Sequence, residues 1–155
     1  MKKLNIIYIT IIIGLVSLEQ LVKYLIINNI NLYQKIVVIS DLFNITYVKN
    51  TGAAWSVLQG RMNLFYFITL IALVLFINML LRYGDFKKNR LFTISLIFII
   101  AGALGNFIDR LFLRYVVDYL EFFIFGYGFP VFNLADIFLT LGTAGFAFST
   151  LFNER

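Results

Sequence analysis

Any chemistry of this chain must come from Asp, Glu, Lys, Ser, Thr, Tyr, Asn or Arg side chains, and the acids are considered first. The sequence contains no cysteine and no histidine. That composition excludes thiol nucleophiles, His-ligated zinc and a Ser-His-Asp relay. Two carboxyl groups held close together share one proton and can act as general base and general acid in the same reaction. Hydrolysis by paired carboxyls, which requires no metal and no other cofactor, is therefore one chemistry open to the chain.

Four long apolar stretches must position these acids. Of the 155 residues, 61% are hydrophobic and 14% are charged, whereas soluble domains have about 25% charged residues. A bilayer core needs about 20 apolar residues per helix, and the stretches that qualify are 4–27, 62–81, 91–108 and 133–152. We therefore predict an all-α membrane protein, a four-transmembrane-helix bundle, with residues 1–155 forming a single integral membrane domain.

Basic residues indicate the orientation of the spans. The net charge is +5, and the loop 82–90 holds four basic residues in nine. Short loops rich in Lys and Arg stay in the cytoplasm, so both termini are expected there. Because the positive charges flank apolar runs, we interpret them as a topology signal and expect no nucleic-acid partner. Most of the acids then fall at the outer face of the membrane.

Two outer loops have the composition of strands. Residues 41–50 and 115–132 are rich in β-branched and aromatic side chains, with turn-forming glycines nearby. We expect them to form a small extracytoplasmic β-cradle on the outer membrane surface. Glu121, within the second loop, is expected to face water. Asn50 and Gly52 begin a stretch of small residues that would allow a ligand to approach the backbone closely, although a tight turn explains the stretch equally well.

Polar residues near the outer ends of the spans allow two interpretations each. Asn133 and Asp136 lie on one polar stripe of the last span. Asn133 could cap the helix while the charge of Asp136 complements the helix dipole, or both could be functional groups. Asn106, Asp109 and Arg110 end the third span, where Asp109 and Arg110 could form an interfacial ion pair. The other possibility is that Arg110 is buried and holds nearby carboxylates ionised.

Glu19 and Lys23 are four residues apart in the first span, which favours a structural ion pair. Asp118 is an acid among apolar neighbours, which is unusual for a solvated loop. On residue types and spacing alone, Asp118 and Asp136 remain two candidates among six acids in or near the outer loops: Glu19, Asp41, Asp109, Asp118, Glu121 and Asp136.

Five islands of sequence together resemble the lipoprotein signal peptidases, also called signal peptidase II. They are Lys23, NTGAAWS at 50–56, GALGNFIDR at 102–110, VVD at 116–118 and FNLAD at 132–136. The resemblance covers nearly the whole chain in the right order. It implies a bacterial multi-pass cytoplasmic-membrane enzyme that removes signal peptides from prolipoproteins. The cut would lie just before a cysteine that carries a diacylglyceryl group.

The resemblance also assigns roles to residues. It implies that Asp118 and Asp136 are the two catalytic aspartates of an aspartic endopeptidase, with the active site at the outer leaflet. It further implies supporting or substrate-binding roles for a larger set: Asn50, Gly52, Asn106, Asp109, Arg110, Asn133, Lys23 and Glu19. The family usually has Asp at the position of Glu19, so the role of that residue is open. Expected partners are diacylglyceryl prolipoproteins, membrane lipid and the inhibitor globomycin, and the expected oligomeric state is a monomer.

Other functions compete with this interpretation. Ser56 with Lys35 or Lys49 could form a Ser-Lys peptidase, although nothing in the sequence would desolvate either lysine. A small proton-coupled transporter could use Asp109, Asp136 and the Glu19–Lys23 pair as a relay. A non-catalytic membrane scaffold could use the same residues for helix packing. Polar groups gathered at one face disfavour a transport path.

Overall fold

The chain forms four long helices, as expected. The computed structural model describes residues 6–52 and 62–152. The helices are α1 (Ile6–Asn29), α2 (Met62–Tyr83), α3 (Arg90–Leu113) and α4 (Leu134–Phe152). All four are long and apolar enough to cross a membrane. The prediction of four spanning helices is therefore confirmed.

Helix α3 extends five residues beyond the predicted end of its span. The predicted span, 91–108, stops just before Asp109 and Arg110. In the structure Asp109 is buried inside the bundle, so its charge does not terminate the helix. The helix ends instead where Arg114 adopts a left-handed conformation with φ of 67°.

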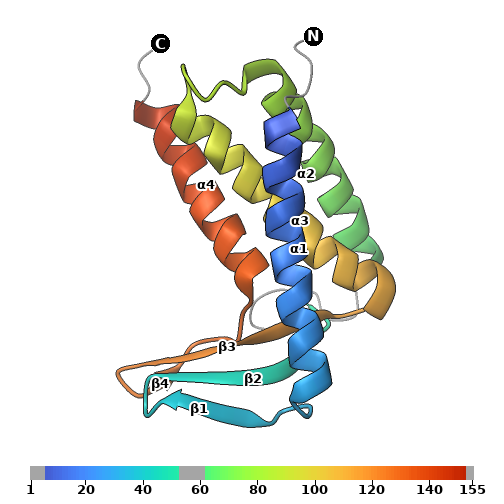
Figure 1. Cartoon of the computed structure of the whole chain (residues 1–155), viewed down its shortest axis with the longest axis vertical. Helices are drawn as coiled ribbons and strands as arrows, with labels where there is room; N and C mark the ends of the chain where they lie inside the picture. Colours follow the sequence, from blue (N-terminus) through green and yellow to red (C-terminus); the bar gives the residue numbers. More distant parts are fainter. Residues whose placement is uncertain (1–5, 53–61, 153–155) are drawn as a thin grey trace.

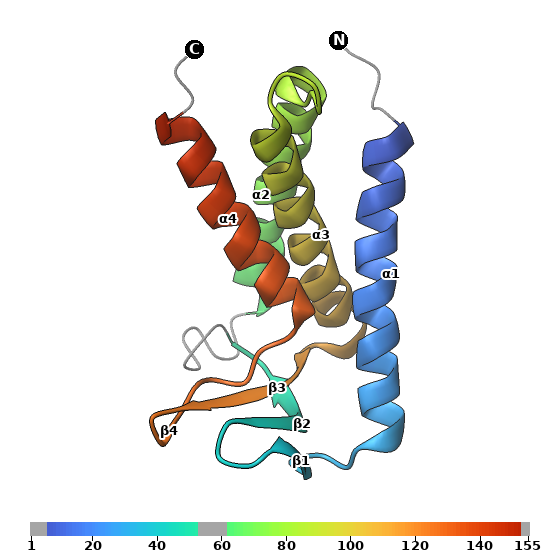
Figure 2. The ribbon, with the colours of Figure 1, turned by 60° about the vertical axis from the view of Figure 1, so that its left-hand side comes forward.

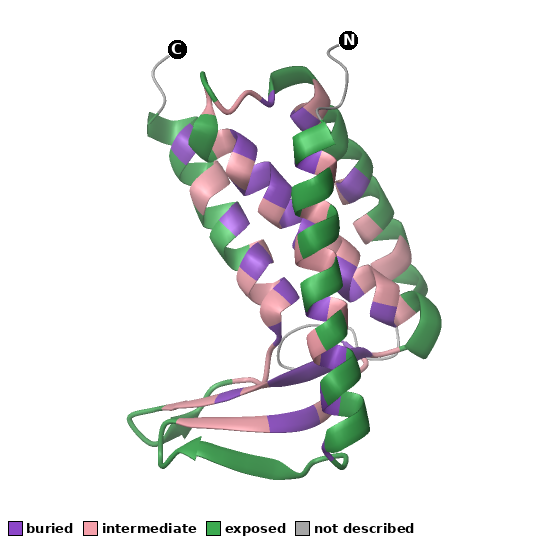
Figure 3. Cartoon of the chain, in the orientation of Figure 1, coloured by how far each residue is buried: buried purple, intermediate pink, exposed green. Residues whose placement is uncertain are grey.

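Helix α3 is the central helix of the bundle, and α1, α2 and α4 pack around it (Figures 1 and 2). Its buried side chains line the middle of the bundle, whereas much of α1 is exposed on the outside (Figure 3). Glycines bring α3 and α4 into close contact. A Cβ atom added to Gly102 would lie 2.4 Å from the carbonyl oxygen of Ala135. Small residues at this helix contact thus place the start of α4 directly against α3.

The two segments expected to form the β-cradle make one antiparallel sheet. Its strands are β1 (Lys35–Ile39), β2 (Phe43–Asn50), β3 (Val116–Ile124) and β4 (Tyr127–Gly128), in the order β1-β2-β3-β4. The prediction of a small β-cradle is confirmed, although β1 lies outside the predicted strand segments. The sheet lies at one end of the bundle, and the start of α1, the end of α4 and the α2–α3 connection lie at the other (Figures 1 and 2).

Strand β3 is held against the bundle by apolar packing. Val117 and Tyr119 of β3 form a buried cluster with Ile26 in the last turn of α1, with Ile30 just after that helix, and with Tyr47 of β2. Because β2 and β3 pair with Val48 opposite Asp118, this packing also fixes the position of Asp118. The sheet is thus joined firmly to the helices at the point where the acids gather.

The expectation that Glu121 faces water is wrong. Its side chain is largely buried and accepts hydrogen bonds from Lys35 Nζ at 2.6 Å and from Asn44 Nδ2 at 2.9 Å. Burial acts to raise the pKa of Glu121, but the contacts with Asn44 and Lys35 outweigh it and hold that pKa below its ordinary value. A lysine from a strand not predicted from the sequence, β1, provides the ion partner.

Candidate active site

Asp118 points from β3 towards the bundle and is almost fully buried, with 2% of its surface exposed. Two side-chain amides hold its carboxyl group. Asn50 Nδ2 at the end of β2 donates to Oδ2 at 2.8 Å, and Asn133 Nδ2 donates to Oδ1 at 2.7 Å. The segment that carries Asp118 therefore folds back over the bundle and reaches the start of α4.

Asp136 lies in the first turn of α4, one turn beyond Asn133. Asn133 Oδ1 accepts a hydrogen bond from the Asp136 backbone at 2.9 Å, and Asp136 Oδ2 accepts one from the Asn133 backbone at 3.2 Å. This reciprocal pair is a capping box, so the interpretation of Asn133 as a helix cap is confirmed. The other oxygen, Oδ1, accepts a hydrogen bond from Asn106 Nδ2 at 2.8 Å. Capping uses only one oxygen of the Asp136 carboxyl, and the other oxygen contacts Asn106 on α3.

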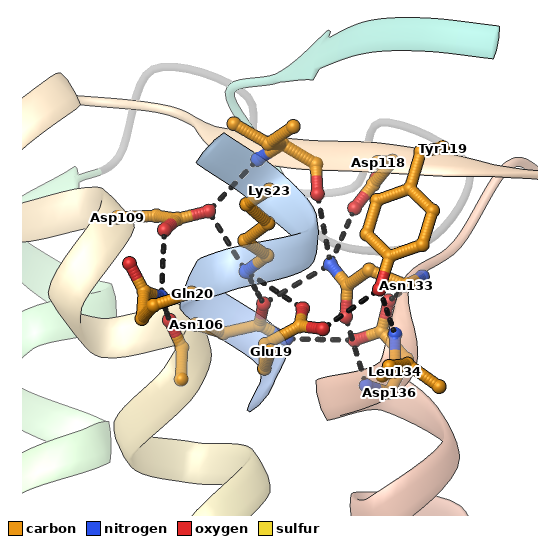
Figure 4. Close-up of polar contacts among 12 residues, drawn as sticks. Glu19, Gln20, Lys23, Asn106, Asp109, Asp118, Tyr119, Asn133, Leu134 and Asp136 are labelled. Carbon is orange, nitrogen blue, oxygen red and sulfur yellow. Dashed lines mark hydrogen bonds and ion pairs between the residues drawn. The ribbon is translucent and has the colours of Figure 1, made fainter. Parts of the chain in front are cut away.

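Asn133 connects the two aspartates, since its side chain bonds Asp118 and its backbone bonds Asp136 (Figure 4). Both carboxyl groups line a cavity of about 720 Å³ between α2, α3, α4 and residues 129–132. The cavity wall is mainly apolar, while its polar residues include Asn50, Asn106, Arg110, Asp118 and Asp136. A cavity of this kind suits a ligand with a long apolar part and one polar group near the aspartates.

Burial and a neighbouring charge change the acidity of Asp118. The pKa of its carboxyl is raised to about 7, first because burial disfavours the charged form and second because Asp136 is negatively charged. The hydrogen bonds from Asn50 and Asn133 and the positive charge of Lys23 oppose this shift. Asp118 can thus hold a proton close to neutral pH, which a solvated aspartate cannot do.

Lys23 occupies the centre of a second buried cluster, next to the aspartates (Figure 4). Its Nζ lies 3.1 Å from Glu19 Oε1, 2.8 Å from Asp109 Oδ2 and 3.1 Å from Asn106 Oδ1. The predicted ion pair of Glu19 and Lys23 is confirmed. Asn106 links the two clusters, because the amide whose oxygen contacts Lys23 donates through its nitrogen to Asp136. Lys23 therefore fixes the orientation of that amide.

Asp109 has a structural task between the sheet and the helices. Its Oδ2 accepts a hydrogen bond from the backbone N–H of Val117 at 2.9 Å, and its Oδ1 accepts one from Gln20 Nε2 at 3.1 Å. Of the ion pairs found among residues 6–52 and 62–152, none joins Asp109 to Arg110; Asp109 pairs with Lys23. The suggestion of an Asp109–Arg110 pair that closes the helix is therefore not supported.

Arg110 lines the cavity and ties the end of β2 to α3. It donates to the carbonyl oxygen of Gly52 at 3.2 Å and to that of Asn106 at 3.3 Å, and its guanidinium lies 4.6 Å from the ring centre of Phe65. Gly52 in turn donates its backbone N–H to Asn50 Oδ1 at 2.9 Å. This Asx-type turn orients the amide of Asn50 towards Asp118.

The structure brings together most of the residues proposed from the sequence and adds others. Tyr119 contacts Glu19, and Gln20 contacts Asp109. Gln20 lies between Glu19 and Lys23 in the sequence pattern shared with the family, whereas no feature of the sequence marks Tyr119 as part of the site. Ser56 lies outside the described residues. Lys35 pairs with Glu121, which lies three residues beyond Asp118 on β3. In the part of the chain that the structure describes, no group of three or more acidic residues could hold a metal ion.

Comparison with known proteins identifies the family. A sequence model of the family described as signal peptidase (SPase) II matches residues 11–152. The chain belongs to the signal peptidase II family. The lipoprotein signal peptidase of Listeria monocytogenes serotype 4a (strain HCC23) is 43% identical over 135 residues, which cover 87% of this chain and 86% of the relative. The lipoprotein signal peptidase of Listeria innocua serovar 6a has the same identity and coverage.

Solved structures agree with this membership. A bacterial membrane enzyme structure obtained by the in meso method superposes with a TM-score of 0.88 at 34% identity and covers 99% of this chain and 94% of that one. A second such structure gives a TM-score of 0.86 at 35% identity, with 99% and 97% covered. The four helices and the family together support a multi-pass protein of a bacterial membrane.

Proposed function

We propose that this member of the signal peptidase II family is an aspartic endopeptidase that removes the signal peptide from diacylglyceryl-modified prolipoproteins. The cut lies just before the lipidated cysteine. The curated relatives are named lipoprotein signal peptidases. The observation that carries the catalytic assignment is the bridge through Asn133, which places Asp118 and Asp136 together at the polar part of an apolar cavity.

The two carboxyls share the work of amide hydrolysis. Asp118 holds the proton, because burial and the charge of Asp136 raise its pKa to about 7. Asp136 acts as the base: it takes a proton from a water molecule whose oxygen attacks the scissile carbonyl carbon. Asp118 donates its proton to the carbonyl oxygen, and a tetrahedral diol results. When the carbon–nitrogen bond breaks, the proton now on Asp136 passes to the departing amine, and Asp118 recovers a proton from the diol.

Three asparagines orient the catalytic carboxyls. Asn50 and Asn133 donate to Asp118, while Asn106 donates to Asp136. Because neutral amides hydrogen-bond a carboxyl without adding a full charge, the pair can keep one proton. Lys23 acts on the aspartates indirectly, because it contacts the side-chain oxygen of Asn106. It also compensates the negative charges of Glu19 and Asp109.

The geometry suits a substrate anchored in lipid. The cavity wall includes apolar side chains of α2 and α4, which reach into the membrane, and its polar residues lie where the sheet meets the bundle. Acyl chains on the cysteine can remain among lipids while the peptide bond lies beside the aspartates. We place both termini in the cytoplasm, with the basic loop 82–90, and the catalytic pair at the outer leaflet.

Further parts of the proposal follow from family membership. We propose a single integral membrane domain, 1–155, that acts as a monomer and binds globomycin in the same cavity. No observation favours the transporter or the scaffold as a second candidate. The proposed catalytic mechanism requires no metal and no other cofactor.

Cleavage of a defined substrate tests this function. The purified chain, reconstituted in lipid, is incubated with one prolipoprotein in two forms, with and without the diacylglyceryl group. Mass spectrometry of the products identifies the new N-terminus. We expect cleavage before the cysteine in the lipidated form, blocked by globomycin, and at least a hundredfold slower cleavage of the unmodified form. Equal cleavage of both forms, or cleavage at another bond, would contradict the proposal.

A further inference from the structure

The hydroxyl group of Tyr119 connects three elements that meet at the catalytic pair. It donates a hydrogen bond to Glu19 Oε2 on α1 at 2.7 Å and accepts one from the backbone N–H of Leu134 at 3.1 Å (Figure 4). Leu134 is the first residue of α4, so its N–H has no partner within the helix. Tyr119 itself follows Asp118 on β3. The Tyr119 hydroxyl thus joins β3, which carries Asp118, to both α1 and α4, and α4 carries Asp136.

The direction of these hydrogen bonds is determined by their partners. The Leu134 N–H can only donate, so the oxygen of Tyr119 accepts there and its single proton is left for Glu19. Oε2 of Glu19 therefore acts as the acceptor, while Oε1 forms the ion pair with Lys23 at 3.1 Å. Tyr119 and Glu19 are 3% and 1% exposed, so water cannot readily replace either contact. An unsatisfied hydroxyl or carboxylate oxygen here would be costly.

Backbone bonds reinforce the same junction. The N–H groups of Tyr119 and Leu120 both donate to the carbonyl oxygen of Phe132, at 3.0 and 2.8 Å. The chain therefore enters α4 alongside β3, and the Tyr119 hydroxyl holds the next step, at Leu134. Removing the hydroxyl frees the first turn of α4, which carries Asp136, to shift relative to β3.

We propose that Glu19 and Tyr119 form a clamp that sets the position of Asp118 relative to Asp136, with Tyr119 as a positioning residue for the catalytic reaction. This inference rests on the proposed function. The clamp depends on the length of the Glu19 side chain as well as on its charge. Asp in place of Glu19 would withdraw the carboxylate by about 1.5 Å, the length of one carbon–carbon bond. The hydrogen bond to Tyr119 would then stretch from 2.7 Å to about 4 Å, beyond bonding distance.

A double-mutant cycle tests the clamp. We measure kcat and KM on the lipidated prolipoprotein for wild type, Glu19→Asp, Tyr119→Phe and the double variant. Each single change should lower kcat about tenfold, since one hydrogen bond to a charged group is lost, and should alter KM less than about twofold. The double variant should fall no more than about threefold below the slower single variant, because both changes break the same bond.

Two further variants separate positioning from a general loss of stability. Tyr47→Phe is the matched control: Tyr47 belongs to the same buried cluster as Tyr119, but its hydroxyl contacts Tyr115, so kcat should stay at the wild-type value. Glu19→Gln keeps the length of the side chain and should retain a higher kcat than Glu19→Asp, which keeps only the charge.

Each possible result bears on the clamp. A double variant about a hundredfold below wild type would show that the two residues act independently and would overturn it. Wild-type kcat in both single variants, an equal loss in Tyr47→Phe, or Glu19→Asp more active than Glu19→Gln would also overturn it. If wild type cleaves and the cycle is additive, the clamp alone fails. If wild type itself does not cleave, the proposed function fails and the clamp fails with it.

Discussion

Replacing Asp118 by asparagine should raise the stability of the folded chain at alkaline pH. The pKa of Asp118 in the folded chain is about 7, against an ordinary value of 3.8. A group whose pKa is raised by folding stabilises the fold least when it is ionised. Wild-type stability should therefore fall as pH rises from about 4 to about 7 and then level off. The variant is neutral at every pH and lacks this loss.

The magnitude follows from the size of the shift. About three pKa units correspond to roughly 4 kcal/mol of disfavoured ionisation. Asparagine presents only one acceptor oxygen, whereas Asp118 accepts from both Asn50 and Asn133. The lost acceptor costs about 1–2 kcal/mol. The variant should thus gain about 2 kcal/mol above pH 8, or a Tm about 5 °C higher for a chain of this size. Below pH 4 it should be the less stable of the two.

Thermal unfolding in lipid or detergent, measured for both proteins between pH 4 and pH 9, gives the answer. Asp41→Asn is the matched control, because Asp41 is exposed in the turn between β1 and β2, with φ of 59°, where asparagine fits equally well. Its Tm should follow that of wild type at every pH. If Asp118→Asn is as destabilised at pH 9 as at pH 4, the argument that burial disfavours the ionised Asp118 is wrong.

Three more predictions concern acid–base state, packing and charge. The value of kcat/KM should fall as pH rises through about 7, because Asp118 then loses its proton; a level profile up to pH 9 would contradict this. Gly102→Ala should cost about 1–3 kcal/mol, since the new Cβ meets the Ala135 carbonyl oxygen at 2.4 Å. Gly14→Ala, with nothing within 4 Å of its Cβ, should be neutral or stabilising, and equal Tm changes for these two would refute the packing argument. Lys23→Met should lower Tm by roughly 10 °C, because it leaves buried carboxylates without a cation; an unchanged Tm would show that the cluster does not depend on Lys23.

The sequence predicted the helices and the small sheet well, because both follow from strong local signals. Long apolar stretches define spans, and the composition of the two outer loops indicated strands. The Glu19–Lys23 pair and the Asn133 cap were also predictable, since spacing of three or four residues within one helix determines which side chains meet.

Contacts between distant segments could not be derived in this way. Spacing cannot show that Lys23 also pairs with Asp109, 86 residues further along the chain, or that Lys35 covers Glu121. These partners meet only after β3 has docked on α1 and α3. Tyr119 is the clearest case: it reads as an ordinary apolar strand residue, and only the fold brings its hydroxyl to Glu19 and α4.

The central claim is that Asp118 and Asp136 together perform the cleavage, and the direct measurement is kcat on a diacylglyceryl prolipoprotein for Asp118→Asn and Asp136→Asn. Asp41→Asn serves as the control for the same chemical change outside the site. We predict that each variant of the pair remains folded and loses at least about a hundredfold in kcat, the contribution of a general acid or base, while the control cleaves at the wild-type rate. Wild-type cleavage by either folded variant of the pair would contradict the account.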